Sequence, residues 1–197
     1  LLGSGAREHA LAWKFSGERS VSEILCAPGN AGIAQHARCV PLDVGDSKAV
    51  LALAESEGVD FTVVGPELPL ACGVADMFSE AGHILFGPLQ AAARLESSKV
   101  FAKEFMKRHQ IPTARFKVCQ NATEAMSIVS GENFGFPVVI KADGLAAGKG
   151  VTVASDRHAA EAAVTTAMIE RKFGNAGTRL VIEECLVGQE VSFFVLC

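Results

Sequence analysis

The sequence lacks several features that would assign it to common functional classes. It has no run of lysine and arginine, and its formal net charge is −4, so its surface does not suit a nucleic acid. No apolar stretch approaches the roughly 18 residues that a membrane span requires. No signal peptide is visible, although the sequence does not begin with Met. We therefore expect neither a nucleic acid nor a membrane as partner.

The cysteines do not form any CxxC pair. They stand singly in apolar surroundings or near turns, at positions 26, 39, 72, 119, 185 and 197. This pattern favours reduced, buried thiols in a cytoplasmic protein over disulfides or a zinc site. Hydrophobic residues make up 49% of the 197 residues, which suffices for a real core in one or two domains.

The first half of the chain alternates short apolar runs with helical patterns. Strands are expected at residues 1–2, 22–27, 61–64 and 84–86, and helices at residues 8–15, 47–56 and 70–81. This alternation predicts an α/β fold with an N-terminal doubly wound parallel sheet. Ligands bind beyond the carboxyl ends of the strands in such sheets.

The second half predicts a smaller α+β domain. A helix over residues 91–109, broken near Ser97 and Ser98, leads into strands at 116–118, 180–184 and 191–196 and helices at 122–130 and 158–170. We expect a domain over residues 1–95, a connecting helix and linker over 96–116, a second domain over 117–186 and the start of a further one over 187–197. Because both ends of the sequence have the pattern of interrupted strands, we expect the chain to be a fragment of a larger enzyme.

The most informative stretch is PVVIKADGLAAGKGVTVA, residues 137–154. An apolar run ends on Lys141, a loop with Gly144, Gly148, Lys149 and Gly150 follows, and β-branched residues then resume. Glycines let a backbone approach an anion closely, and backbone amides in such a loop can cradle phosphates. Two lysines supply positive charge, so the stretch predicts a site for a polyphosphate such as ATP.

This loop differs from a P-loop, in which the lysine precedes Ser or Thr and a helix begins at the phosphates. Here Gly150 follows Lys149, and a strand-like run comes next. The pattern favours a glycine-rich lid between two antiparallel strands. The alternative is a plain hairpin with a glycine turn.

Three strand ends in the first half supply further candidate residues. The turn at Gly3, Ser4 and Gly5 suits a single phosphate at a helix start, and Arg7 adds charge. It differs from a dinucleotide fingerprint, because Glu8 stands where the third glycine belongs and no acidic residue ends the second strand. The other two strand ends carry Pro28, Gly29 and Asn30, and Gly65, Pro66 and Glu67. The alternative for each is a tight turn or a surface side chain without a ligand.

The segment after residue 180 suits recognition of a nucleoside. Glu183 and Glu184 end an apolar strand, Cys185 and Leu186 follow, and Glu190 stands four residues later. Backbone groups of an extended connector can read an adenine edge, and a carboxylate can accept hydrogen bonds from ribose hydroxyls. The alternative for this segment is an exposed acidic strand end.

In order, the motifs GSGAREHALAWK, APGNAG, VVGPELPL, FGP, LESSKVFAKEFM, IPTARF, FPVVIKADGLAAGKGV and VIEECLVGQEVS resemble those of one family. That family is the glycinamide ribonucleotide synthetases, or phosphoribosylamine–glycine ligases, of the ATP-grasp superfamily. The resemblance covers essentially the whole chain. It implies a pre-ATP-grasp domain followed by the small lid subdomain of the ATP-grasp fold.

The resemblance implies ligation of glycine to 5-phosphoribosylamine in purine biosynthesis, with ATP converted to ADP and phosphate through a glycyl phosphate. It implies that Lys99 and Lys141 hold ATP phosphates. It also implies that residues 144–150 form the lid, that Glu183, Cys185 and Leu186 contact adenine, and that Glu190 holds the ribose. The three N-terminal strand ends would help to bind phosphoribosylamine.

Two departures and one gap accompany the resemblance. Ala6 stands where the family usually has glycine, and Leu68 where it usually has alanine. The ligands for Mg²⁺ or Mn²⁺ are expected beyond Cys197, so we assign no metal ligand or catalytic residue here and expect this chain alone to be inactive. Two alternatives are another ATP-grasp ligase with a different acceptor and a non-catalytic nucleotide-binding module. The sequence leaves the oligomeric state open.

Overall fold

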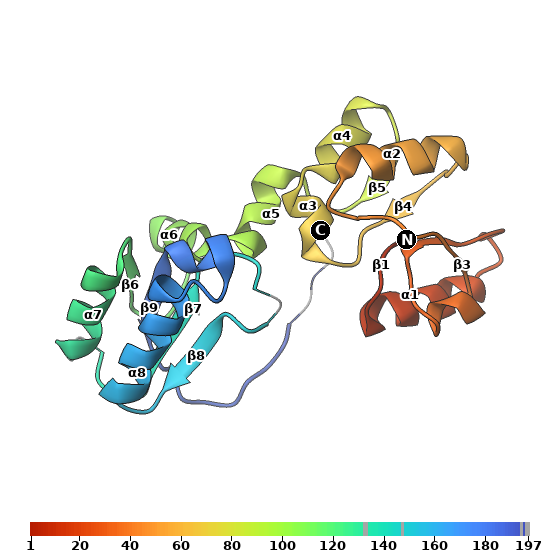
Figure 1. The fold of residues 1–197 in the computed structure, drawn as a ribbon. Helices are drawn as coiled ribbons and strands as arrows, with labels where there is room; N and C mark the ends of the chain where they lie inside the picture. Colours follow the sequence, from red (N-terminus) through yellow and green to blue (C-terminus); the bar gives the residue numbers. More distant parts are fainter. Residues whose placement is uncertain (132–133, 147, 194, 196–197) are drawn as a thin grey trace. The chain divides into compact units, whose positions relative to one another are not determined.

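The computed structural model describes residues 1–131, 134–146, 148–193 and 195 (Figure 1). The chain divides into two compact units, Leu1–Ser97 and Ser98–Cys197. The finer four-part division drawn from the sequence stays a prediction. No helix among the described residues is long and apolar enough to cross a membrane.

The first unit contains short parallel strands. They are β1 (Leu2–Gly3), β2 (Leu25–Pro28), β3 (Arg38–Cys39), β4 (Thr62–Val63) and β5 (Leu85–Phe86). β2 lies between β1 and β3, β4 pairs with β5, and a parallel bridge from Leu2 to Val64 joins the two groups. The resulting order, β3-β2-β1-β4-β5, reverses direction beside β1, as a doubly wound sheet does.

Helices cover both faces of this sheet. They are α1 (Ala6–Ser16), α2 (Ser47–Ser56), α3 (Glu67–Ala71), α4 (Val74–Glu80) and α5 (Gln90–Ser97), with a 3₁₀ turn over Ile33–Gln35. In β2, Ala27 packs in a cluster with residues of α2 and α4, whereas the preceding Cys26 packs with Ala12 and Ile33. Successive strand residues point to opposite faces, so each face has its own core. The predicted α/β class is confirmed.

Two sequence predictions for the first unit, a helix at 70–81 and a buried strand that includes Phe61, were wrong in detail. The helix expected at 70–81 is two helices, because Gly73 adopts a left-handed conformation with φ of 84° and interrupts the helical hydrogen bonds. α3 begins at Glu67, which places Pro69 in its first turn, where a missing amide is tolerated. Phe61, expected in a buried strand, is 53% exposed and precedes β4.

The second unit is an antiparallel sheet in the order β6-β9-β7-β8. The strands are β6 (Phe116–Cys119), β7 (Val138–Ala142), β8 (Val151–Ala154) and β9 (Leu180–Glu184). The helices are α6 (Lys99–Arg108), α7 (Ala122–Ser130) and α8 (Arg157–Val164), with a π-helical turn over Thr165–Ile169 and a 3₁₀ turn over Gly174–Thr178. The π-helical turn replaces the end of the helix expected over residues 158–170.

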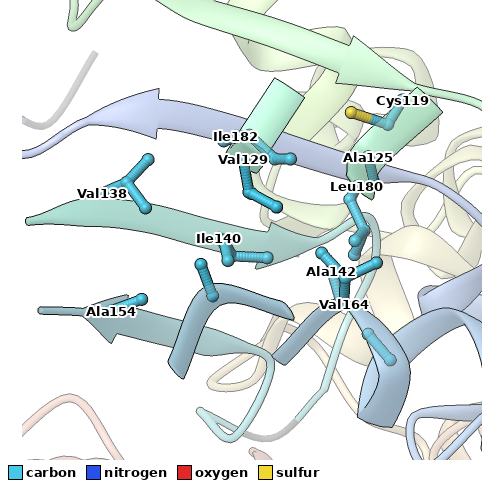
Figure 2. Close-up of a cluster of buried hydrophobic side chains, with 12 residues drawn as sticks. Cys119, Ala125, Val129, Val138, Ile140, Ala142, Ala154, Val164, Leu180 and Ile182 are labelled. Carbon is cyan, nitrogen blue, oxygen red and sulfur yellow. The ribbon is translucent and has the colours of Figure 1, made fainter. Parts of the chain in front are cut away.

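The core of the second unit lies between this sheet and the helices α7 and α8. Figure 2 shows Ile140 and Ala142 of β7 gathered with Leu180, Ala125 and Val164. Because side chains alternate along a strand, Val139 and Lys141 point to the opposite face. The register pairs Val139 with Glu183 and Lys141 with Val181, so Glu183 shares that face.

The strand expected at 191–196 was wrong for the residues that can be described. Val191 and Phe193 belong to no strand and are 80% and 87% exposed. β-Branched and aromatic residues predict strands only where a neighbouring strand and an apolar surface receive them. Phe194 and Leu196, part of the same prediction, lie outside the described residues.

Candidate functional site

The glycine loop joins two paired antiparallel strands, as the sequence predicts. Lys141 of β7 pairs with Val151 of β8, and the amide of Ala142 donates to the carbonyl of Gly150 at 2.7 Å. Gly144 and Gly148 have φ values of 136° and 76°, which L side chains rarely adopt. The chain therefore needs glycine at both positions. Ala147, also in the predicted lid, lies outside the described residues.

The base of this loop is fixed by Asp143. Its carboxylate accepts hydrogen bonds from the hydroxyl of Ser98 at 2.8 Å, the amide of Val100 at 3.1 Å and the guanidinium of Arg179 at 2.5 Å. The side chain of Asp143 is only 5% exposed. Ser98 caps α6 by accepting from the amide of Phe101, so Asp143 ties the loop to the start of that helix.

Lys99 is placed beside the loop by this arrangement. It is the first residue of α6, and its ammonium donates to the carbonyl of Gly144 at 3.0 Å. Lys149 is exposed, and its backbone amide donates to the carbonyl of Ala146 at 2.9 Å. The structure thus brings Lys99, to which the family resemblance gives a role in phosphate binding, to the loop that carries Lys149.

A buried carboxylate lies between two lysines on the face opposite the core. Glu183 is 3% exposed, and its two carboxylate oxygens contact the ammonium groups of Lys141 and Lys103. Lys103 also donates to the hydroxyl of Thr113 at 2.7 Å. Two cations and one anion leave a net positive charge there, which suits a polyphosphate.

Glu184, predicted at the nucleotide site, makes a different contact. Its carboxylate accepts from the amide of Arg115 at 2.8 Å and from the guanidinium of Arg115 at 2.6 Å. The backbone hydrogen bond, and then the guanidinium, lower the pKa of Glu184. Its carboxylate is therefore engaged in joining β9 to the start of β6, so it has a structural role in addition to any contact with a nucleotide.

The remaining predicted nucleotide residues follow β9. Cys185 is half-buried, Leu186 is 69% exposed, and Glu190 is exposed in a segment without regular structure. The segment directly after β9, residues 185–187, has no regular secondary structure. The assignment of these residues to adenine and ribose stays a prediction.

The first unit has a cavity of about 430 Å³ at the carboxyl ends of its strands. Its lining includes six residues predicted for substrate binding: Gly3, Ser4, Gly5, Arg7, Pro28 and Pro66. The residues Ala6 and Leu68, at which the sequence departs from the family pattern, line the same cavity, as do Glu8 and Val44. The strand ends therefore meet around one cavity, as the parallel sheet requires.

The other four predicted residues support the walls of this cavity. Glu67 contacts Arg7, with the guanidinium 3.2 Å from a carboxylate oxygen. Asn30 donates to the carbonyl of Ser4 at 2.8 Å and accepts from the amide of Gly32. Gly29 and Gly65 donate backbone hydrogen bonds to the carbonyls of Gly3 and Leu2.

Sequence reasoning missed the role of Glu8. This residue is 3% exposed and accepts a hydrogen bond from the amide of Gly5 at 2.6 Å, which is the glutamate half of a capping box on α1. A Cβ atom on Gly65 would lie 2.2 Å from a carboxylate oxygen of Glu8, so that glycine makes room for the carboxylate. The sequence feature that could have indicated this contact is a glutamate three residues after Gly5, the position from which a side chain reaches back to the cap amide.

Sequence reasoning also missed Asp143, Arg179 and Lys103. Asp143 directly follows a buried strand, a position that marks it as a candidate site residue. Its partners Ser98 and Arg179, however, are 45 and 36 residues away in the sequence. Lys103 stands one helical turn after Lys99, and nothing local distinguishes it from a surface lysine. Within the described part of the chain, no group of three His, Cys, Asp or Glu side chains is arranged to hold a metal ion.

Family models match both units. The model described as phosphoribosylglycinamide synthetase, N domain, matches residues 1–96, and that of the ATP-grasp (A) domain of the same enzyme matches residues 97–197. The phosphoribosylamine–glycine ligase of Xylella fastidiosa strain Temecula1 is 54% identical over 195 residues, 98% of this chain and 45% of that protein. The ligase of Ralstonia nicotianae is 52% identical over 197 residues, 100% of this chain and 46% of that protein.

Solved structures agree with the sequence comparison. The phosphoribosylamine–glycine ligase of Thermotoga maritima has a TM-score of 0.68 and 34% identity, covering 95% of this chain and 44% of that one. A biotin carboxylase domain from Hydrogenobacter thermophilus, crystallised with MgADP, has a TM-score of 0.72 at 18% identity, over 94% of this chain and 44% of that one, and supports the fold alone. The chain thus spans less than half the length of the relatives it matches.

Proposed function

This chain belongs to the phosphoribosylglycinamide synthetase family, and we propose that the full-length protein joins glycine to 5-phosphoribosylamine, converting ATP to ADP and phosphate. The identities of 54% and 52% to phosphoribosylamine–glycine ligases support this assignment. The product, glycinamide ribonucleotide, belongs to purine biosynthesis, so we propose a cytoplasmic location.

One structural observation carries the proposal for ATP: cationic groups gather beside the glycine loop of the second unit. Lys99 contacts the loop carbonyl of Gly144, and Lys141 lies on the sheet face away from the core. Charge-assisted hydrogen bonds from lysine are suited to phosphate oxygens. We assign Lys99, Lys141 and Lys149 to the phosphates and Cys185, Leu186 and Glu190 to the nucleoside, because the carboxylate of Glu183 is already engaged by Lys103 and Lys141.

A carboxylate does not react with an amine at neutral pH unless it is activated. ATP supplies the activating phosphoryl group, and the task of the protein is to position the reactants and to neutralise charge. Lys99 and Lys141 would stabilise the negative charge that develops on the phosphoryl oxygens. The glycine loop would keep water from the reacting groups. Divalent metal, Mg²⁺ or Mn²⁺, is proposed as a further participant, with ligands beyond Cys197.

The cavity of the first unit is proposed to bind phosphoribosylamine. Its wall includes the N-terminus of α1, where backbone amides favour an anion, and the exposed guanidinium of Arg7. Glu8 already occupies the amide of Gly5, so the phosphate would bind at the other amides of the turn and at Arg7. Arg7 would then exchange Glu67 for the phosphate.

The test uses the full-length protein, purified and supplied with ATP, a divalent metal and both substrates. We expect ADP release that depends on glycine and on phosphoribosylamine together, with a product of the mass of glycinamide ribonucleotide. ADP release with another amine acceptor in place of phosphoribosylamine would contradict the proposed acceptor. Nucleotide binding without any ligation product would reduce the protein to a binding module.

A further inference from the structure

We propose that Lys103 is a positioning residue of the nucleotide site, which acts by holding the carboxylate of Glu183. This leaves the ammonium of Lys141 available to exchange the carboxylate for a phosphate. The inference rests on the proposed ATP-binding function. It assigns a role to a residue that contacts the site only through Glu183.

Lys103 is fixed in one position by its surroundings. It lies in α6, one helical turn after Lys99, and is 8% exposed. Its ammonium donates to Thr113 at 2.7 Å and lies 5.7 Å from the centre of the Phe116 ring. The ammonium of Lys103 is therefore held by the hydroxyl of Thr113, the ring of Phe116 and the carboxylate of Glu183.

The negative charge of the buried Glu183 carboxylate is compensated by Lys103 and Lys141. Its oxygen that faces Lys103 is fully buried and has no hydrogen-bond partner among the described residues, so the ionic contact with Lys103 is its compensation. The other oxygen contacts Lys141. A buried carboxylate that loses one cation must retain the other, because an uncompensated buried charge is costly.

The two lysines differ in their access to a ligand. The side chain of Lys141 is 27% exposed and that of Lys103 is 10% exposed. Lys141 can therefore turn toward a phosphate, whereas Lys103 stays on the carboxylate. With Lys103 present, Glu183 remains compensated when Lys141 moves. Without Lys103, each phosphate contact by Lys141 would leave Glu183 unpaired.

The same helix links this pair to the loop. The start of α6 is tied to the loop by hydrogen bonds from Ser98 and Val100 to Asp143, and one turn later Lys103 ties α6 to β9 through Glu183. Lys99 lies between Ser98 and Val100, within the first attachment. The pair of Lys103 and Glu183 therefore also affects the nucleotide site by fixing the position of α6, the helix that begins with Lys99.

The test measures binding of a non-hydrolysable ATP analogue to the full-length protein. Lys103→Met keeps the length of the side chain and removes its charge, and we expect the Kd to rise about tenfold, within the range of coupled charged contacts. Lys107→Met, on an exposed position of the same helix, is the matched control and should leave the Kd unchanged. Because the effect is on ATP binding, the KM for ATP should change more than kcat.

A second background separates positioning from mere support of the fold. With Glu183→Gln the carboxylate charge is gone, and Lys103→Met added to it should change the Kd by less than about twofold. An unchanged Kd in the single variant, with only the unfolding temperature lowered, would overturn the proposal. An equal loss in both backgrounds would overturn it too.

Thr113→Val covers the case in which Lys103→Met does not fold. It removes the hydroxyl that Lys103 contacts and keeps both charges, so the Kd should rise about threefold. No change in the Kd would again contradict the proposal. If the unaltered protein fails to bind the analogue, the proposed function fails; if it binds and the Lys103 variants bind equally well, only this inference fails.

Discussion

The hydroxyl of Ser98 donates to the carboxylate of Asp143 at 2.8 Å and thereby joins the start of α6 to the base of the glycine loop. Ser98 is thus both the cap of a helix, through the amide of Phe101, and an anchor of the candidate lid. Through it, a change at either residue reaches Lys99, whose ammonium is 3.0 Å from the carbonyl of Gly144.

Asp143→Ala should weaken both the fold and the nucleotide site. The variant loses the hydrogen bonds from Ser98, Val100 and Arg179, and we expect the free energy of unfolding to fall by about 2 kcal/mol. Chemical denaturation measures this loss, and the Kd of an ATP analogue should rise in parallel. Asp156→Ala, which removes the cap of α8 and a hydrogen bond from Ser155, should leave the Kd unchanged. Equal effects of the two variants on the Kd would exclude a specific link between Asp143 and the loop.

Gly148→Val should disturb the loop through its backbone. Gly148 has a φ of 76°, and a Cβ atom added to it would have no neighbour within 4 Å, so the cost of valine is conformational, about 1–2 kcal/mol. The loop would avoid this cost by changing shape, and affinity for an ATP analogue should fall. Gly58→Val, with a φ of 62° and equally open space in the other unit, is the control. Wild-type nucleotide binding by the Gly148 variant would make the loop a simple connector.

The sequence predicted the elements whose signals are local. The helices Ser47–Ser56 and Ala122–Ser130 and the strand Leu180–Glu184 have the predicted bounds, because apolar spacing and caps such as Asp46 and Asn121 lie within or directly beside the segments themselves. The break before α6 was also predicted, since Ser98 is a recognisable cap. The break between α3 and α4 depends on one residue, Gly73. Its left-handed conformation could not be deduced from its neighbours in the sequence.

The residues of the candidate site also differ in whether the sequence could indicate them. Lys141 and the loop glycines belong to one continuous motif, so the sequence alone could name them as candidates. Lys103 and Asp143 owe their importance to partners far along the chain, Lys103 to Glu183 and Asp143 to Arg179. Only the folded chain reveals such pairs, because a single sequence carries no record of which charges meet.

The pair of Glu184 and Arg115 should make stability depend on acid. The pKa of Glu184 is lowered from 4.5, first by the backbone amide of Arg115 and then by its guanidinium. A lowered pKa in the folded state contributes stability above the ordinary value, and this contribution is lost as the pH falls through the lowered value. Urea denaturation between about pH 7 and about pH 3 should therefore show a smaller acid-induced loss for Glu184→Gln than for the wild type. Glu104→Gln, on the exposed side of α6, is the control, and parallel pH curves for all three proteins would contradict the assigned role.

Gly65→Ala should destabilise the first unit. The added Cβ would lie 2.2 Å from an oxygen of Glu8, which is buried and caps α1, so the carboxylate must move. Overpacking of this kind costs about 1–3 kcal/mol, measured as the free energy of unfolding. Gly17→Ala, whose Cβ would be 3.6 Å from its nearest neighbour, should have little effect. Indistinguishable stabilities for the two variants would mean that Glu8 can leave its place without cost.

Lys141→Met should reduce affinity for ATP far more than it reduces stability. The variant removes a charge-assisted phosphate contact worth about 1.5–3 kcal/mol, which corresponds to a rise in Kd of roughly tenfold to a hundredfold. Stability should change little by comparison, because Glu183 keeps its contact with Lys103. Lys117→Met, exposed on β6 of the same sheet, removes an equal charge away from the candidate site and should leave the Kd as it is. If both variants bind the analogue as the wild type does, Lys141 serves only to compensate Glu183; if both lose affinity equally, the effect is one of net charge, and the phosphates bind elsewhere.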